Sequence, residues 1–346
     1  MAHQNHEYHE YIVEQTEKVI GIDSPTGYHY NVQKYLVDTI QAMGFEVRTL
    51  RKGGVIANLG GEGNPLMMLA HVDTLGAFVH YIKGNGRLAI SNGTLNPNNI
   101  ETENVRVITR SGAVYEGTIQ LENASVHVNP DVNAERKFTN LEVVLDEDVT
   151  SKEDVEKLGI CAGDFLAVEP RFQVTEKGYI KSRFLDDKLS AAILLAYGIA
   201  KYVSEHPGCL KRNVQLFFTT FEEIGHGASA GIPEEIEDLL AVDMGCVGDH
   251  LACTEKQVSI CAKDSSGAYH FEMTNELIEV AKEHGIDYAV DIYPSYGSDA
   301  GAALRSGKDV RYALIGQGVY ASHGYERTHK DGMKQTFELA LNYVLK

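Results

Sequence analysis

The order of apolar and polar residues predicts two helices at the beginning of the chain. Residues 6–43 carry apolar side chains at helical spacing, interrupted by Ser24-Pro25-Thr26-Gly27. This interruption indicates a turn and a helix N-cap, because serine and threonine hydroxyls accept hydrogen bonds from the free N–H groups of a first helical turn. Residues 65–70 then form a continuously apolar run. A short run without alternation is typical of a strand that is covered on both faces.

Strands and helices alternate after residue 171. Residues 214–221 predict a strand, and residues 274–284 and 331–345 predict amphipathic helices. Residues 189–203 are apolar nearly all round, which predicts a buried helix, and residues 233–240 are interpreted as a further helix. The alternation predicts an α/β fold with a mostly parallel or mixed sheet and helices on both faces.

The middle of the chain has a different pattern of apolar and polar residues. Between residues 79 and 170, short β-type runs recur and are broken by Gly and Asn. We therefore expect a discontinuous α/β domain, formed by residues 1–78 and 171–346, into which a small β-rich domain of residues 79–170 is inserted. A chain of 346 residues is long enough for two such domains.

Charge and cysteine content exclude several classes of function. The formal net charge is -18, and an acidic surface repels nucleic acid and anionic membranes. No apolar run is long enough to cross a bilayer, and the N-terminal residues lack the pattern of a signal peptide, so we expect a cytoplasmic location. The five cysteines include no C-x-x-C pair, which argues against a disulfide framework or a cysteine-based zinc site.

Five short clusters place Asp, Glu or His at a turn or directly after a predicted strand. In open α/β sheets, sites form beyond the carboxyl ends of the strands. Each cluster alone has an ordinary explanation: a His-x-Asp triplet is commonly a surface feature, paired aspartates cap helices, and paired glutamates lie exposed in loops. Together the clusters indicate two oxygen-rich metal sites that share one carboxylate. They are His71-Val72-Asp73, Asp186-Asp187, Glu222-Glu223, Asp243, and the segment 322–329 with His323 and His329.

The two paired glutamates are expected to have different roles. Two carboxylates at the end of an apolar strand are costly to bury without a cation or a proton. One of Glu222 and Glu223 would bind a metal, and its neighbour would act as a general base toward water.

These motifs resemble the M42 glutamyl/tetrahedral aminopeptidases, within the wider clan of two-metal exopeptidases. The resemblance extends over nearly the whole chain, and the motif set is highly specific. The residues that carry it are Ser24-Pro25-Thr26-Gly27, Ala70-His71-Val72-Asp73, Leu185-Asp186-Asp187-Lys188, Glu222-Glu223-Ile224-Gly225, Val242-Asp243, Gly297-Ser298-Asp299-Ala300, and the segment 157–164 of the inserted domain.

The resemblance implies a role for each site residue. The general base would be Glu222, and the hydroxide that it generates would bridge two divalent metal ions, most naturally zinc, with cobalt or manganese as alternatives. Asp73 would orient His71, Asp186 would bridge the metals, and Asp187 would shape the backbone there. The remaining metal ligands would be His71 and Asp243 at the first ion and Glu223 and His323 at the second.

The last ligand is an open choice between two histidines. In the family, the final His is usually followed by Ser or Thr and then Pro, with Glu four residues on. Here His323 is followed by Gly324-Tyr325, and Glu326 stands three residues on, so His329 is an alternative. We prefer His323 because it lies closer to the end of the preceding strand.

The resulting hypothesis is a cytoplasmic metallo-aminopeptidase that acts on short peptides and forms a homo-oligomer, with the inserted domain as the contact and a dodecamer as one outcome. One alternative is a two-metal deacylase or carboxypeptidase-like amidohydrolase, for which Arg327 would recognise a substrate carboxylate. Another is a binding scaffold without catalysis. Asp299, in the turn 297–300, is either a pocket residue or part of a structural turn.

Overall fold

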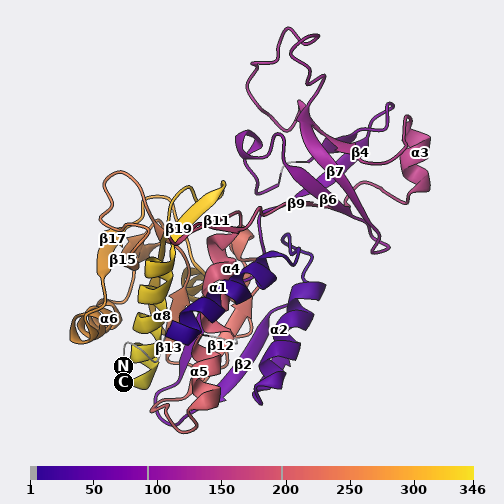
Figure 1. Ribbon diagram of the computed structural model, residues 1–346. Helices are drawn as coiled ribbons and strands as arrows, with labels where there is room; N and C mark the ends of the chain where they lie inside the picture. The colour runs from indigo at the N-terminus through magenta and orange to yellow at the C-terminus, as the bar shows by residue number, and fades with distance from the viewer. Residues whose placement is uncertain (1–5, 92, 196–197) are drawn as a thin grey trace. The chain divides into compact units, whose positions relative to one another are not determined.

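A computed structural model describes residues 6–91, 93–195 and 198–346 of the chain (Figure 1). The chain divides into two compact units. The larger unit comprises Met1–Thr74 and Arg171–Lys346, and the smaller unit comprises Leu75–Pro170. Among the described residues, no helix is both long enough and apolar enough to cross a membrane.

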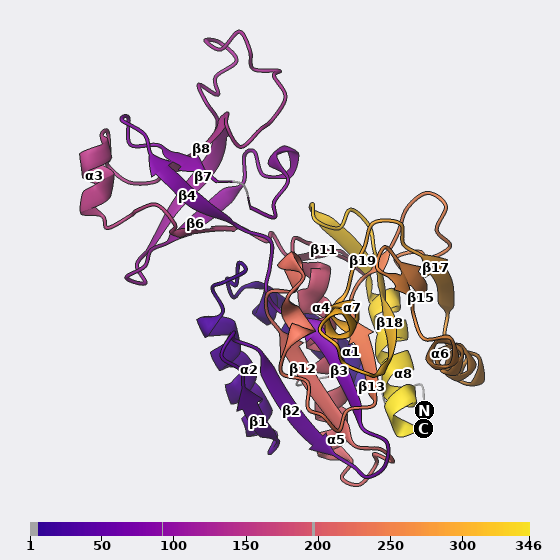
Figure 2. The same ribbon diagram turned by 180° about the vertical axis from the view of Figure 1, so that it is seen from behind.

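One ten-stranded mixed sheet forms the centre of the larger unit (Figure 2). Its four middle strands, β12, β3, β13 and β18, run parallel to one another, and antiparallel strands flank them. The order across the sheet is β1 (Glu46–Thr49), β2 (Val55–Gly60), β12 (Val214–Thr219), β3 (Leu66–His71), β13 (Asp238–Val242), β18 (Arg311–Val319), β15 (Val258–Asp264) and β16 (Gly267–Ala268), with β14 (Gly245–Cys246) on β18 and β17 (Tyr288–Ile292) on β15.

Helices cover both faces of this sheet, which confirms the predicted α/β class. On β3, Leu66, Met68 and Ala70 face the larger apolar core, whereas Met67 and Leu69 face the smaller one, because side chains alternate along a strand. Figure 1 looks onto the first face and Figure 2 onto the second. The first face carries α1 (His6–Ile20), α2 (Tyr30–Ala42), α4 (Leu185–Leu194), α5 (Ile199–Glu205), α6 (Phe271–His284) and α8 (Lys330–Leu345), and the second carries α7 (Asp299–Arg305) and the 3-10 turn η3 (Gly227–Ser229).

Two of the expected helices differ in the structure. Residues 233–236 form a loop, and β13 begins at Asp238, so the helix expected over 233–240 is wrong. The buried helix expected over 189–203 corresponds to α4 and α5, and residues 196–197 between them lie outside the described residues.

A small three-stranded sheet of the larger unit joins two loops that matter below. It pairs β11 with β10 on one side and with β19 on the other, all antiparallel. Ser182, near the start of α4, is the register partner of Glu326. The strands are β10 (Gln173–Val174), β11 (Tyr179–Ser182) and β19 (Glu326–His329).

The smaller unit is a closed six-stranded barrel. On β7, alternate residues are buried: Gly117, Ile119 and Leu121 face the inside of the barrel. The order around the barrel is β4 (Ala77–Ile82), β5 (Leu88–Ile90), β8 (Leu141–Leu145), β7 (Val114–Leu121), β6 (Asn104–Ile108) and β9 (Phe165–Val168), and the unit also contains α3 (Lys152–Lys157) and the 3-10 turn η1 (Pro97–Asn99).

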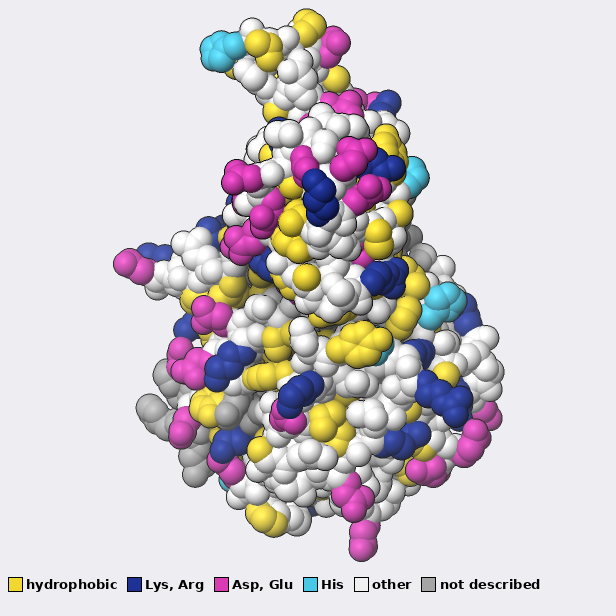
Figure 3. Space-filling model, turned by 90° about the vertical axis from the view of Figure 1, so that its right-hand side faces the viewer, with side chains coloured by type: hydrophobic (Ala, Val, Ile, Leu, Met, Phe, Trp, Pro, Cys, Tyr) yellow, Lys and Arg dark blue, Asp and Glu magenta, His cyan; other side chains and the backbone are white. Residues whose placement is uncertain are grey.

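Basic and acidic side chains are intermixed on one face of the molecule (Figure 3). Among the described residues of that face, Lys and Arg are scattered between Asp and Glu side chains. A continuous basic surface, of the kind that binds nucleic acid, is therefore not formed there.

Candidate metal centre and active-site pocket

Three parallel strands deliver the first site residues to one edge of the sheet. β3 ends at His71, and the neighbouring β12 ends at Thr219, its register partner. β13, on the other side of β3, ends at Val242, directly before Asp243. Because the carboxyl ends of parallel strands meet at one edge, residues far apart in the sequence become neighbours there.

The beginning of α4 supplies a fourth set of atoms. Phe184, its N-cap residue, has a left-handed backbone with φ 66°, and Asp186 and Asp187 depart from helical geometry, with a cis peptide bond between them. An oxygen of Asp187 accepts a hydrogen bond from the backbone N–H of His71 at 3.1 Å. The loop that precedes the regular part of α4 is thereby tied to the end of β3.

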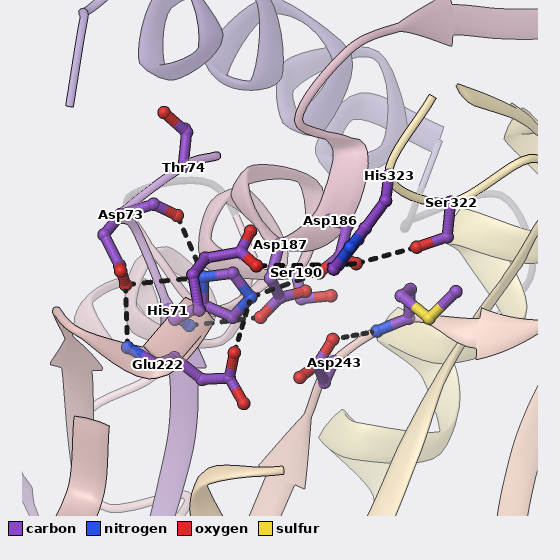
Figure 4. Close-up of polar contacts among 12 residues, drawn as sticks. His71, Asp73, Thr74, Asp186, Asp187, Ser190, Glu222, Asp243, Ser322 and His323 are labelled. Carbon is purple, nitrogen blue, oxygen red and sulfur yellow. Dashed lines mark hydrogen bonds and ion pairs between the residues drawn. The ribbon is translucent and has the colours of Figure 1, made fainter. Parts of the chain in front are cut away.

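Asp186 lies between two histidines (Figure 4). Its Oδ1 is 3.1 Å from Nε2 of His71, and its Oδ2 is 3.5 Å from Nε2 of His323. Ser322 also donates a hydrogen bond to Oδ2 at 2.9 Å. Each oxygen of this one carboxylate therefore faces a different imidazole.

The first candidate cation site consists of His71, Asp186 and Asp243. One ligand atom of each lies within 4.8 Å of the others, and all three residues are buried. Nδ1 of His71 is 3.0 Å from the backbone carbonyl of Asp73 and 3.7 Å from its carboxylate. The carbonyl accepts from Nδ1–H, which fixes the tautomer and leaves Nε2 facing Asp186.

A second group lies on the other side of Asp186. Nε2 of His323 is 3.5 Å from Oε2 of Glu223. The other oxygen of Glu223 is buried and has no hydrogen-bond partner among the described residues. A buried carboxylate oxygen without a partner is costly, and a cation would satisfy it.

Asp73 also fixes the backbone of Glu222. The carboxylate of Asp73 accepts from the N–H of Glu222 at 3.1 Å and from the hydroxyl of Thr26 at 2.7 Å. An oxygen of Glu222 lies 3.7 Å from Nε2 of His71. Glu222 and Glu223 both belong to η2 (Glu222–Ile224), which follows β12 through Phe221, a residue with left-handed φ.

Burial and like charge work against ionisation of these carboxyl groups. Burial, reinforced by the neighbouring Asp186, raises the pKa of Asp243 to about 7 and that of Glu223 well above its ordinary range. Burial is also the main cause of the raised pKa of Glu222. Asp186 is the exception: burial opposes its ionisation, but hydrogen bonds with His323 and His71 outweigh burial and lower its pKa. A cluster of this kind is stabilised by cations, so the donor set of imidazole nitrogens and carboxylate oxygens fits divalent metal ions.

The candidate site opens into a pocket of about 570 Å³. Asp186, Glu222, Glu223, Asp243 and His323 line one part of it. The rest of the lining consists of Gly225, Met244, Cys246, Ser295, Tyr296, Gly297, Ser298, Arg305 and Ser322.

Three residues that the sequence analysis offered as alternative site residues make contacts elsewhere. His329 is the N-cap of α8: its Nδ1 accepts from the N–H of Asp331, and its Nε2 is 2.8 Å from the carbonyl of Lys177. Arg327, suggested as the residue that recognises a carboxylate, pairs with Glu255 at 3.0 Å instead and is not in the pocket lining. Asp299 accepts hydrogen bonds from Thr219 and from the N–H of Ala228, and so braces η3 rather than lining the pocket.

Sequence reasoning missed two residues near the site. Glu326 is buried and accepts from the N–H groups of Asp186 and His323, and Arg305 lines the pocket. The unusual sequence spacing between His323 and Glu326, three residues instead of four, was a signal that could have identified Glu326. Nothing in the sequence around Arg305 distinguishes it from a surface residue at the end of a helix.

Comparisons with known proteins agree with this geometry. The model of the M42 glutamyl aminopeptidase family matches residues 53–339. The chain is 44% identical, over 96% of each chain, to the protein YhfE of Bacillus subtilis, which is named as a candidate aminopeptidase. It is 24% identical to a lysyl aminopeptidase of Pyrococcus furiosus over 60% of this chain and 59% of that protein.

Solved structures share the fold. The aminopeptidase APDkam598 of Desulfurococcus kamchatkensis aligns with a TM-score of 0.86 at 21% identity and covers 98% of this chain and 95% of that one. The TET1 peptidase of Pyrococcus horikoshii, described as assembling into a tetrahedron or a large octahedral shell, aligns with a TM-score of 0.84 at 20% identity, covering 96% of this chain and 99% of that one. The family match over most of the chain, together with the YhfE relative, shows that the chain belongs to the M42 glutamyl aminopeptidases, a family of metal-dependent aminopeptidases.

Proposed function

We propose that this protein removes N-terminal residues from short peptides with the help of two divalent metal ions. The observation that carries the proposal is the position of Asp186, whose two carboxylate oxygens face His71 on one side and His323 on the other. A carboxylate placed in this way could contribute one oxygen to each of two neighbouring metal ions.

The ligands divide into two sets around Asp186. His71 and Asp243 would complete the first site, and Glu223 and His323 would complete the second. Mixed imidazole and carboxylate donors suit zinc, and cobalt or manganese are alternatives. When bound, such ions supply Lewis acidity toward the scissile carbonyl and lower the pKa of water.

Glu222 is the proposed general base. It lines the pocket beside the two ligand sets, and Asp73 holds its backbone. From this position Glu222 would accept a proton from the attacking water and deliver a proton to the leaving amine. The free amino group of the substrate would bind near a metal ion or an acidic group of the pocket.

One alternative reaction is supported by a specific observation. A guanidinium in the pocket favours substrates with a carboxylate, and Arg305 lines the pocket. A two-metal deacylase or carboxypeptidase-like enzyme recognises a carboxylate where an aminopeptidase recognises an amine. A non-catalytic scaffold is less well supported, because the proposed base and all the proposed ligands lie together at one pocket.

We also propose a homo-oligomer whose contacts involve the smaller unit. Val126 and Val128 of that unit are 66% and 64% exposed, so they offer apolar surface that another copy of the chain could cover. Light scattering on the purified protein tests this proposal, and a monomer in solution would contradict it. Val126→Asp with Val128→Asp should reduce the mass if these residues lie in the contact.

Amino-acid release from matched free and N-acetylated peptides tests the proposed reaction. Protein depleted of metal with a chelator is assayed after addition of zinc, cobalt or manganese. Release from free peptides that returns with metal supports the aminopeptidase. Cleavage of acetylated substrates alone would indicate a deacylase instead of an aminopeptidase. No cleavage with any metal would favour the non-catalytic scaffold.

A further inference from the structure

The residue after Asp243 is held by a phenol from a distant part of the chain. Tyr296 lies in the segment between β17 and α7, and it lines the pocket together with Asp243 and Met244. The hydroxyl of Tyr296 donates a hydrogen bond to the backbone carbonyl of Met244 at 3.1 Å. This contact joins the loop before α7 to the proposed metal ligand that follows β13.

The backbone of Met244 also holds the carboxylate of Asp243. Its N–H donates a hydrogen bond to Oδ1 of Asp243 (Figure 4). The N–H of Met244 is thus bound to the carboxylate, and its carbonyl is bound to Tyr296. The orientation of the carboxylate toward His71 and Asp186 therefore depends on how the backbone of Met244 is placed.

Asp243 and Met244 form a short break between two paired strands. β13 ends at Val242 and β14 begins at Gly245, and both pair with β18. The backbone of Asp243 still lies against β18, because a Cβ added at Gly316 would be 1.3 Å from the carbonyl oxygen of Asp243. Within the break, the hydroxyl of Tyr296 supplies the hydrogen bond to the next carbonyl along the chain.

Tyr296 is itself fixed by contacts away from the metal ligands. Its backbone N–H donates to the hydroxyl of Ser265 at 3.3 Å, and its carbonyl accepts from the N–H of Ser265 at 3.2 Å. Its ring packs against that of Tyr293, with the ring centroids 5.1 Å apart and the planes at 60°. The side chain that reaches Met244 is therefore held in one position before any ligand binds.

The phenol also favours the charged form of Asp243. Burial, reinforced by the charge of Asp243, raises the pKa of Tyr296 well above its ordinary range, so the phenol keeps its proton and remains a donor. Burial and Asp186 raise the pKa of Asp243 to about 7, and hydrogen bonds from Met244 and Tyr296 oppose that rise. A hydrogen bond to an ionised carboxylate stabilises the form that a cation binds.

We propose that Tyr296 is a positioning residue for the first metal site and holds Asp243 in the orientation that binds a divalent cation. The inference rests on the proposed two-metal function and adds to it a residue from outside the ligand clusters. Removing the hydroxyl should weaken the first site, because the carbonyl of Met244 loses its donor. The second site, with Glu223 and His323, should be unaffected.

Tyr296→Phe tests the proposal, because it removes the hydroxyl and keeps the ring. Protein depleted of metal is titrated with zinc against a chromophoric chelator, which gives the dissociation constants of both sites without an activity assay. We expect one constant to rise about tenfold, as is typical of groups that orient metal ligands, and the other to stay the same. In His323→Ala, which should retain only the first site, Tyr296→Phe should cause the same loss.

Tyr293→Phe is the matched control. Tyr293 is 1% exposed and its hydroxyl contacts that of Ser259, but Tyr293 is absent from the pocket lining that the described residues form. The same chemical change there should lower Tm in the presence of chelator and leave both zinc constants unaltered. Ser265→Ala, which removes a contact to the backbone of Tyr296, should weaken the first site to a smaller extent. An equal loss of zinc affinity in Tyr293→Phe and Tyr296→Phe would overturn the proposal, because it would indicate general loosening.

Failure of the positioning role and failure of the proposed function give different results. If the wild type binds zinc and Tyr296→Phe changes neither constant, or changes none in the His323→Ala background, the positioning role is overturned and the two-metal function stands. If the wild type binds zinc but releases no amino acid from peptides, the aminopeptidase fails, and the zinc constants still decide the role of Tyr296. If the wild type binds none of zinc, cobalt and manganese, both proposals are overturned.

Discussion

Glu326 accepts a hydrogen bond from the backbone N–H of Asp186 at 3.0 Å. Its other carboxylate oxygen accepts from the backbone N–H of His323, also at 3.0 Å. One buried side chain thus joins the two loops that carry the proposed bridging ligand and the proposed last ligand. The pairing of Ser182 with Glu326 brings these loops together, because β11 leads into α4 and β19 follows the His323 loop.

Replacing Glu326 by Gln should weaken metal binding. The amide nitrogen of Gln cannot accept a hydrogen bond, so one of the two backbone N–H groups loses its partner. Groups that orient metal ligands typically contribute a factor of about 10–100 to metal affinity. We expect a loss of about tenfold, measured by competition with a chromophoric chelator.

Glu255→Gln provides the matched control. Glu255 accepts from Arg327 at 3.0 Å but does not line the pocket. The same chemical change there should leave metal affinity unaltered. An equal loss in both variants would indicate general loosening of β19, and an unchanged affinity in Glu326→Gln would refute the positioning role.

The two neighbouring glutamates should respond differently to the same substitution. Glu222→Gln should retain both metal ions and lower kcat by a factor of about 10²–10⁴, because the proposed base is lost. Glu223→Gln should lose metal, since its carboxylate is a proposed ligand beside His323. Metal content by elemental analysis, together with kcat, distinguishes the two. Reversed results would exchange the proposed roles.

Divalent metal should stabilise the folded protein. A ligand that binds only the folded state adds about 2.7 kcal/mol when present at 100 times its dissociation constant. Addition of zinc to chelator-treated wild type should therefore raise Tm by several degrees. Asp186→Asn removes the carboxylate that faces both histidines, so most of the shift should disappear. Differential scanning calorimetry measures both proteins, and equal shifts would place the metal elsewhere.

The sequence predicted the α/β class and the strand-end clusters because both depend on the order of residues within short segments of the chain. His71 and Asp243 directly follow apolar runs, and parallel strands bring such ends to one edge. The expected helix over 233–240 was wrong for a tertiary reason. The spacing of acidic and apolar residues in this segment is typical of a helix. Asp238–Val242 nevertheless pairs with β3 and β18, and this sheet pairing overrode the local preference for a helix.

Arg305 could not have been found in this way. Its place in the pocket depends on the packing of α7 against the sheet, and the residues beside it in the sequence carry no chemical motif. Glu326 is an intermediate case. Its spacing from His323 was visible, but its contact with Asp186 depends on the register of β11 and β19.

His323 and His329 can be separated by substitution. His323 faces Asp186 and Glu223, whereas the ring of His329 caps α8 and contacts the carbonyl of Lys177. We expect His323→Ala to lose one metal ion per chain. His329→Ala should retain both metals and lose about 1 kcal/mol of stability with the cap. Metal counting on both variants tests this, and loss of metal in His329→Ala alone would reverse the assignment.

The far end of β13 carries a buried ion-pair network whose effect depends on pH. Asp238 is 1% exposed and accepts hydrogen bonds from Arg311 and Arg212, each at 2.7 Å. Burial alone would raise the pKa of Asp238, but the hydrogen bonds from Arg311 and Arg212 outweigh it, so the pKa in the folded state is lowered. The folded chain consequently binds this proton less readily than the unfolded chain does.

The sign of the pH effect follows from this difference. The contribution of Asp238 to stability is fully present above the unfolded pKa of about 3.9 and is lost as the pH falls through the lower folded value. Asp238→Asn should lower the free energy of unfolding by about 3 kcal/mol at pH 7, because two partly buried arginines lose their anion. The difference between wild type and variant should shrink below about pH 4, as urea denaturation at a series of pH values would measure. Asp38→Asn, which breaks an exposed pair with Lys34, should change stability by less than about 0.5 kcal/mol. A difference for Asp238→Asn that stays constant down to pH 2.5 would show that its effect comes from packing and not from charge.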